Sequence, residues 1–200
     1  MQNFAFLYVL FFAGSASLTI ACSSPNGTKD ESLMSAQETQ LEKSPSRRSP
    51  QLFVRQGDRI EEAPEADHAV ARKYPGYENK GPVANGIRVT VLSEKLVYQL
   101  NEPVRVIHVF EATEPGIDVH IMGPKTAHGE FVDGVLRTTK PPTTQYPWVG
   151  VYDGAVLPSP DVDYNYEINS YTFSEAGRHT IQWNPGQLES NILVINVDGG

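Results

Sequence analysis

Three histidines have the side-chain chemistry of a metal site. His108 and His120 lie in neighbouring segments that we expect to be strands, and His128 follows in an expected loop. Imidazole nitrogens of this kind bind zinc when three or four ligands converge. His108 alternates with Val106 and Phe110, so it shares a strand face with apolar side chains. We therefore favour a structural histidine in the core over a metal ligand, and we expect no metal and no other cofactor.

Three carboxylates further along the chain have ligand chemistry suited to calcium. Asp161, Asp163 and Glu167 lie in the stretch SPDVDYNYE. Calcium loops of defined spacing have a glycine at the sharp turn and a bidentate glutamate that closes the loop. That spacing is absent here, and we therefore favour a solvated acidic loop.

Motifs of known catalytic chemistry are missing. The sequence has no G-x-S-x-G elbow, no H-E-x-x-H pair and no glycine loop of the phosphate-binding type. The single cysteine, Cys22, lies near the N-terminus and far from the folded part that we expect. The sequence therefore predicts a protein that is not an enzyme and has no catalytic residues.

Aromatic side chains gather in one segment, KPPTTQYPWVGVYDGAVLPSPDVDYNYE, which runs from Lys140 to Glu167. Loops on a rigid scaffold often bind ligands, and amphipathic rings provide contact area at low entropic cost. We interpret five of these residues as candidate binding residues: Tyr146, Trp148, Tyr152, Tyr164 and Tyr166. The alternative for Trp148 is that it fills the core between two sheets.

The start of the chain is apolar. The segment from Phe4 to Ala21 has no charged residue, and small residues gather toward Cys22. This is the profile of a secretory signal peptide, which we place at residues 1–21. A short membrane span is the alternative, although Gly14 and Ser15 weaken it.

The residues before the cysteine, LTIAC, resemble the lipobox of bacterial lipoproteins. The resemblance implies that the Cys22 thiol carries lipid and that the signal peptide is removed in front of it. Acyl chains on one residue can hold a soluble domain at a bilayer. A lone cysteine cannot form an internal disulfide or a closed zinc site. The resemblance thus implies a bacterial cell-envelope protein in contact with the membrane, and Ser23 after the anchor resembles outer-membrane sorting.

The next part of the chain is polar and poor in large apolar residues. Residues 22–84 are rich in Ser, Pro, Gln and Glu. Such a composition does not bury enough apolar surface to offset the loss of chain entropy. We therefore predict that residues 22–84 form a lipid-anchored, mostly disordered tether.

Charge differs between the tether and the remainder. Residues 23–84 hold nine basic and ten acidic residues, whereas residues 85–200 hold seven basic and fourteen acidic residues. Nucleic-acid binders neutralise phosphates with Lys and Arg, so this excess of acidic residues argues against them. We expect no nucleic-acid partner.

Residues 85–200 have the pattern of one all-β domain. Short runs of β-branched and aromatic residues alternate with Gly, Pro, Asn and Asp, and no amphipathic helix is evident. This rhythm predicts an antiparallel β-sandwich. The strands that we expect are Ile87–Leu92, Val97–Leu100, Val104–Phe110, Ile117–Met122, Val135–Thr139, Trp148–Tyr152, Tyr164–Ser174, His179–Trp183 and Ile192–Val197.

The stretch FSEAGRHTIQW resembles the corner near the end of immunoglobulin-like domains. Those domains have an acidic residue, a glycine and a tyrosine spaced by one residue each, and Glu175, Gly177 and His179 take these places. The glycine permits a tight corner, and the ring bonds back to the upstream backbone. The resemblance implies an immunoglobulin-like sandwich in which Ile181 faces the core, and a last strand, SNILVINV, at the sheet edge.

Together these features favour a cell-envelope lipoprotein whose immunoglobulin-like domain binds a protein or an envelope component without catalysis. One alternative is a carbohydrate-binding module in which the Tyr- and Trp-rich loops stack on sugar rings. A second alternative is a metal-binding envelope protein, for which His108 and His120 are the first ligands to test.

Overall fold

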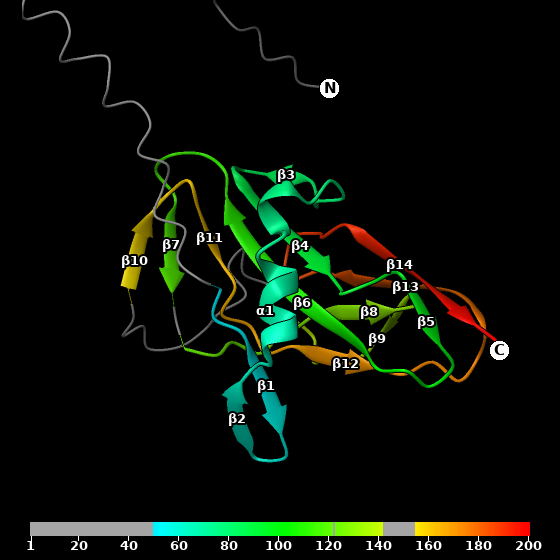
Figure 1. The fold of residues 1–200 in the computed structure, drawn as a ribbon. Helices are drawn as coiled ribbons and strands as arrows, with labels where there is room; N and C mark the ends of the chain where they lie inside the picture. Colours follow the sequence, from blue (N-terminus) through cyan, green and yellow to red (C-terminus); the bar gives the residue numbers. More distant parts are fainter. Residues whose placement is uncertain (1–49, 122, 142–154) are drawn as a thin grey trace, which may run out of the picture. The chain divides into compact units, whose positions relative to one another are not determined.

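The computed structural model describes residues 50–121, 123–141 and 155–200, which form an all-β sandwich (Figure 1). One sheet, here the β6 sheet, has the order β11-β6-β4-β3, and β12 also pairs with β6. The other, here the β13 sheet, has the order β5-β14-β13-β8-β9. The bounds of the β6 sheet are β3 (Val83–Ala84), β4 (Ile87–Leu92), β6 (Val104–Ala112), β11 (Asp161–Asp163) and β12 (Asn169–Tyr171). Those of the β13 sheet are β5 (Val97–Gln99), β8 (Glu130–Val132), β9 (Val135–Leu136), β13 (Gly177–Trp183) and β14 (Ile192–Asp198).

Two small sheets and two helical turns complete the described part. A hairpin joins β1 (Phe53–Gln56) to β2 (Arg59–Glu62), and β7 (Asp118–Ile121) pairs with β10 (Ala155–Pro158). The helix α1 spans Glu65–Ala71, and a 3-10 turn, η1, spans Tyr74–Gly76.

The strand order agrees in part with that of an immunoglobulin-like sandwich. In that fold, strands A, B and E share one sheet, and strands C, F and G share the other. Strands β4, β6 and β12 take the first set of places, and β8, β13 and β14 take the second. The last strand, β14, lies between β13 and β5, with β5 parallel to it. The expectation that the last strand forms the sheet edge is therefore wrong, since β5 is at that edge.

The main core lies between the two sheets and is built from alternate residues of each strand. Val106 and Phe110 of β6 point into it, as do Ile181 and Trp183 of β13. Gln182, between those two, is half-buried. The period of two confirms the register that we expect from the corner motif.

The corner itself has the expected geometry. Gly177 has φ +133°, a conformation that side chains make costly. The ring of His179 reaches back, and its Nε2 donates to the carbonyl of Glu175 at 3.0 Å. Its Nδ1 donates to Asp133 Oδ2 at 2.8 Å. The imidazole ring stacks on the ring of Phe173, with centroids 4.2 Å apart. Histidine thus makes the hydrogen bond that tyrosine makes in antibody domains.

Most predicted strands correspond to observed ones. The segments expected at 87–92, 97–100, 104–110, 117–122, 179–183 and 192–197 overlap with β4, β5, β6, β7, β13 and β14, respectively, and β6, β13 and β14 extend one or two residues beyond the predicted bounds. The segments 135–139 and 164–174 contain only the short strands β9 and β12. The strand expected at 148–152 lies outside the described residues. Strands β1, β2, β3, β8, β10 and β11 were not predicted, because runs of two to four residues give too little alternation to detect.

The segment from residue 50 to residue 84 is folded, so its assignment to a disordered tether is wrong. It forms β1, β2, α1, η1 and β3, and β3 pairs with β4. The domain therefore begins well before Asn85. The expected signal peptide, Cys22 and residues 23–49 lie outside the described residues.

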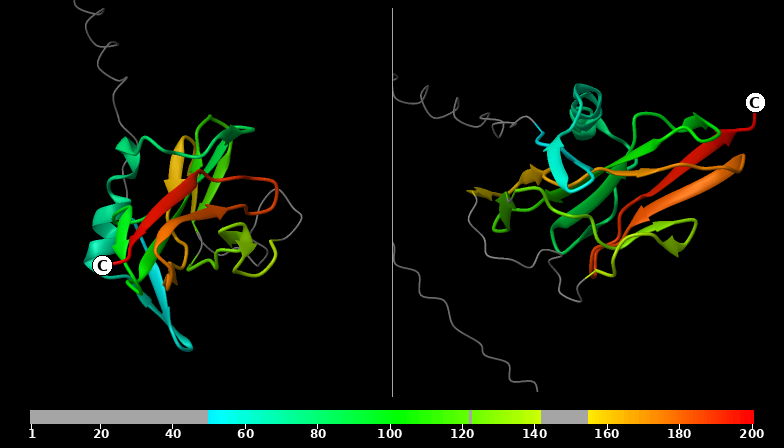
Figure 2. Two further views of the ribbon diagram at one scale, coloured as in Figure 1. Left: turned by 90° about the vertical axis from the view of Figure 1, so that its right-hand side faces the viewer. Right: turned by 90° about the horizontal axis from the view of Figure 1, so that it is seen from below.

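This N-terminal layer, residues 50–77, covers the outer face of the β6 sheet (Figure 2). Leu52, Val70 and Tyr74 are buried in a second core with Ile107 and Val109 of β6. Strand β6 is consequently buried on both faces.

An ion pair also attaches the layer to the sheet. The Arg105 Nε on β6 donates to both carboxylate oxygens of Asp67 on α1, at 2.8 and 3.0 Å. The helix has seven residues, and isolated helices this short are unstable in water, so packing and this ion pair stabilise it. The few apolar side chains of the N-terminal layer come from a hairpin, a helix and a turn. They therefore form no periodic stripe in the sequence.

Candidate functional site

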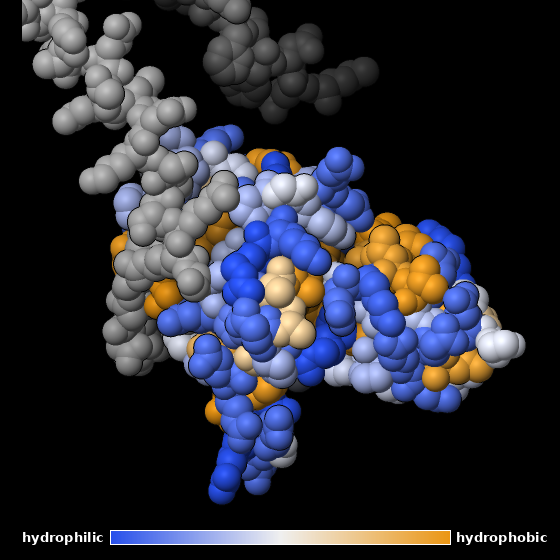
Figure 3. Space-filling view, viewed as in Figure 1, coloured by the Kyte–Doolittle hydropathy of each residue, from blue (hydrophilic) through white to orange (hydrophobic). Residues whose placement is uncertain are grey.

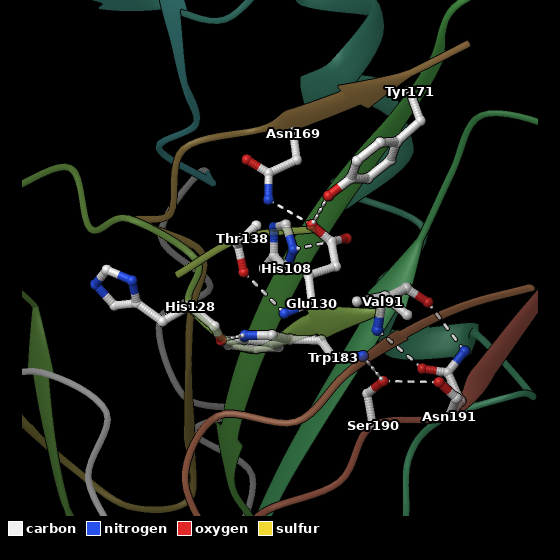
Figure 4. Close-up of polar contacts among 10 residues, drawn as sticks. All are labelled: Val91, His108, His128, Glu130, Thr138, Asn169, Tyr171, Trp183, Ser190 and Asn191. Atoms are coloured by element: carbon white, nitrogen blue, oxygen red, sulfur yellow. Dashed lines mark hydrogen bonds and ion pairs between the residues drawn. The ribbon is translucent and has the colours of Figure 1, made fainter. Parts of the chain in front are cut away.

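A carboxylate and an imidazole meet in the main core (Figure 4). Glu130 on β8 and His108 on β6 come from opposite sheets, and Glu130 Oε1 lies 3.2 Å from His108 Nε2. Both side chains are fully buried. The pair therefore links the two sheets directly.

Glu130 has further polar partners. Asn169 Nδ2 and Tyr171 Oη, both on β12, donate to Glu130 Oε2, the tyrosine at 2.7 Å. Burial acts to raise the pKa of Glu130, but the electrostatic interaction with His108 and these hydrogen bonds outweigh it and hold that pKa below its usual value. Burial and the neighbouring carboxylate raise the pKa of Tyr171, so its hydroxyl stays a donor. Glu130 is therefore ionised in the folded protein.

Trp183 closes the same cluster from β13. Its ring lies edge-on to His108 with centroids 5.0 Å apart, and its Nε1 donates to the carbonyl of His128 at 2.8 Å. A Glu–His pair can transfer protons only to groups within hydrogen-bond reach. With both side chains enclosed, the arrangement fits a structural contact between the sheets better than a reactive site.

The histidines do not converge on a metal site in the described part of the chain. His108 is buried in the core, as the alternation of β6 predicts, whereas His120 lies on β7, outside both main sheets. Among the described residues no group of three or more His, Cys, Asp or Glu side chains could hold a metal ion.

The acidic stretch is not a solvated loop, and that prediction is wrong. Asp163 and Glu167 are buried, and Asp161 is half-buried. Lys125 Nζ contacts Asp163 Oδ2, and Arg55 makes two hydrogen bonds to Glu167 at 2.9 and 2.6 Å. Each buried carboxylate thus has the amino group of a lysine or the guanidinium of an arginine beside it, which is unsuited to a calcium ligand set.

Of the five aromatic residues predicted to bind a partner, three lie outside the described residues: Tyr146, Trp148 and Tyr152. Tyr166 is 2% exposed and packs against Trp183 in the main core, so its interpretation as a surface binding residue is wrong. Tyr164 is half-buried and lies edge-on to Tyr74, with centroids 6.0 Å apart.

A surface that sequence reasoning missed is the outer face of the β13 sheet, called here the open face. The strand register places Leu136, Phe131, Gln182 and Ile192 in one row across β9, β8, β13 and β14. Ile192 and Leu136 are 51% and 38% exposed.

Further apolar residues extend the open face toward β5. Val194 lies opposite Thr180, and Val97 lies opposite Asn196. Val97 is 48% exposed, and Leu96 beside it is 50% exposed. Figure 3 shows apolar side chains gathered near this end of the sandwich, where β5 and β14 lie in Figure 1. The sequence did contain one signal for this face. Ile192 and Val194 are apolar, although they alternate with the buried Leu193 and Ile195 and therefore lie on the opposite side of the strand.

Comparisons with protein-family models, with curated proteins and with solved structures find no match. In the described residues, no helix has the length and apolar character needed to cross a membrane.

Proposed function

We propose that this protein is a lipid-anchored component of the bacterial cell envelope whose immunoglobulin-like domain binds another protein through the open face, without catalysis. The anchor is the Cys22 thiol, supported by the lipobox-like LTIAC. The exposed aliphatic side chains of Val97, Leu136 and Ile192 on the open face carry the proposal of binding.

The two outer faces of the sandwich differ in a way that supports this choice. The β6 sheet buries its outer apolar residues under the N-terminal layer. The β13 sheet presents Val97, Leu136 and Ile192 to solvent. Large exposed apolar patches on an otherwise polar surface mark interaction sites. A protein partner with its own apolar patch would bury them.

The binding surface can be tested with a charge placed on it. Ile192→Asp should remove the protein from the complex in which the unaltered chain migrates after gentle detergent extraction of the envelope. Val83→Asp is the matched control, since Val83 is 45% exposed on β3, in the other sheet. Migration of the unaltered chain as a free monomer, or equal loss in both variants, would contradict the proposal.

The same variants separate the carbohydrate alternative from protein binding. Saturable binding on a glycan array that persists in Ile192→Asp would favour a sugar-binding surface elsewhere on the domain. Absence of glycan binding together with loss of the complex in Ile192→Asp supports the protein partner.

A further inference from the structure

A lysine and an aspartate meet in the main core, beside the ring of Tyr166. Lys125 and Asp163 have side chains that are only 8% and 1% exposed, and Lys125 Nζ contacts Asp163 Oδ2. The Nζ also lies 4.4 Å from the centroid of the Tyr166 ring. Amine and carboxylate are therefore held together in a nearly dry environment.

The backbone around both residues is fixed. The Lys125 N–H donates to the carbonyl of Asn165 at 2.9 Å, and the Glu167 N–H donates to the carbonyl of Lys125 at 2.8 Å. Asp163 lies on β11, opposite Phe110 of β6. Reactants held in one geometry react as if at very high concentration, because the entropy of bringing them together is already lost.

We propose that Lys125 and Asp163 condense to an amide bond that covalently cross-links the folded domain. In the contact pair, one ammonium proton moves to Asp163 Oδ2, which leaves a neutral amine and a carboxylic acid. The Nζ then forms a bond to Cγ of Asp163, and the Cγ–Oδ2 bond breaks. Two of the three ammonium protons leave with Oδ2 as water, and the third stays on the amide nitrogen, so the step needs no oxidant, reductant or other reactant.

Two features of the site assist this reaction. Burial favours the neutral amine of Lys125 and lowers the pKa of this group to about 7. The Asn165 N–H donates to the other carboxylate oxygen, Asp163 Oδ1, at 2.8 Å. That donor is in position to stabilise negative charge on Oδ1 when the tetrahedral intermediate forms, as an oxyanion hole does.

The chain contains a matched pair in which the reaction should not occur. Lys95 Nζ lies 2.6 Å from Glu102 Oε1, but these side chains are 45% and 31% exposed. Water keeps both groups charged there, and an ammonium group is not a nucleophile. Burial is therefore the difference between the two pairs on which the reaction depends.

Peptide mapping of the full chain, purified in folded form and then fully denatured and digested with trypsin, tests the proposal. Without a cross-link, trypsin cleaves after Lys125 and gives separate peptides 106–125, 126–137 and 138–178. With the cross-link, Lys125 is not cleaved, and peptide 106–137 is joined to peptide 138–178. The joined species is lighter by one water than the sum of the two peptides.

Recovery of the joined species as the main product, with normal cleavage after Lys95, is the expected result. In Lys125→Arg the ion pair remains but the joined species should be lost completely. Quantitative recovery of free peptides 106–125 and 138–178 from the unaltered chain would overturn the proposal. A joined species that persists in Lys125→Arg would also overturn it, because another residue would then supply the bond.

Discussion

The change Leu52→Ala tests whether the N-terminal layer belongs to the folded domain. Leu52 is fully buried in the second core, with Ile107 and Val109 of β6. A buried Leu→Ala change removes the transfer free energy of the side chain and leaves a cavity, which together cost about 2–5 kcal/mol of unfolding free energy. For a domain of this size, each kcal/mol lowers the midpoint of thermal unfolding by about 2–4 °C. Urea denaturation followed by circular dichroism measures the free-energy loss directly.

The control for this experiment is Leu96→Ala. Leu96 is 50% exposed, so its truncation should change the unfolding free energy by less than about 0.5 kcal/mol. If Leu52→Ala proves as harmless as Leu96→Ala, residues 50–77 do not pack on the β6 sheet in solution. The argument that β6 is buried on both faces would then be refuted.

Three further predictions address the core, the corner and the anchor. Glu130→Ala should lower the unfolding free energy by about 3–5 kcal/mol in urea denaturation, because it leaves the His108 imidazole buried without its carboxylate. A decrease in unfolding free energy below about 1 kcal/mol would contradict the inter-sheet contact. Hydrogen bonding to Asp133 raises the pKa of His179 above its ordinary value of 6.5, so this contribution to stability should be complete below pH 6.5 and lost as the pH rises through the raised pKa. Unfolding curves at a series of pH values should therefore show His179→Asn approaching the unaltered chain at high pH, and a difference that grows with pH would refute this. Cys22→Ser should abolish labelling by a fatty-acid analogue and release the chain from membranes, whereas unchanged membrane fractionation would point to another anchor.

The central strands could be predicted from the sequence because their own residues determine them. The alternation of β6 and the corner around Gly177 are local patterns, and both specify which side chains enter the core. The two sheets then follow from the rule that strands bury one face against each other.

The folding of residues 50–84 could not be predicted in the same way. Its apolar residues, among them Leu52 and Tyr74, are separated by polar stretches, and their stability depends on the distant strand β6. Long-range contacts of this kind leave no period in the local sequence. The burial of Asp163 and Glu167 was missed for a related reason, since their partners Lys125 and Arg55 lie 38 and 112 residues away.

The open face was missed because an exposed apolar residue is common on protein surfaces and carries little information alone. It becomes informative when the register places Ile192, Gln182, Phe131 and Leu136 in one row. That register depends on pairing between strands far apart in the chain.

Photo-crosslinking in intact cells tests the binding proposal most directly. A photoreactive amino acid replaces Ile192 on the open face or Val83 on β3, with the Cys22 anchor unchanged in both. The proposal predicts one discrete cross-linked protein from position 192 and none from position 83. No discrete product from position 192, or the same product from both positions, would contradict a protein partner on the open face.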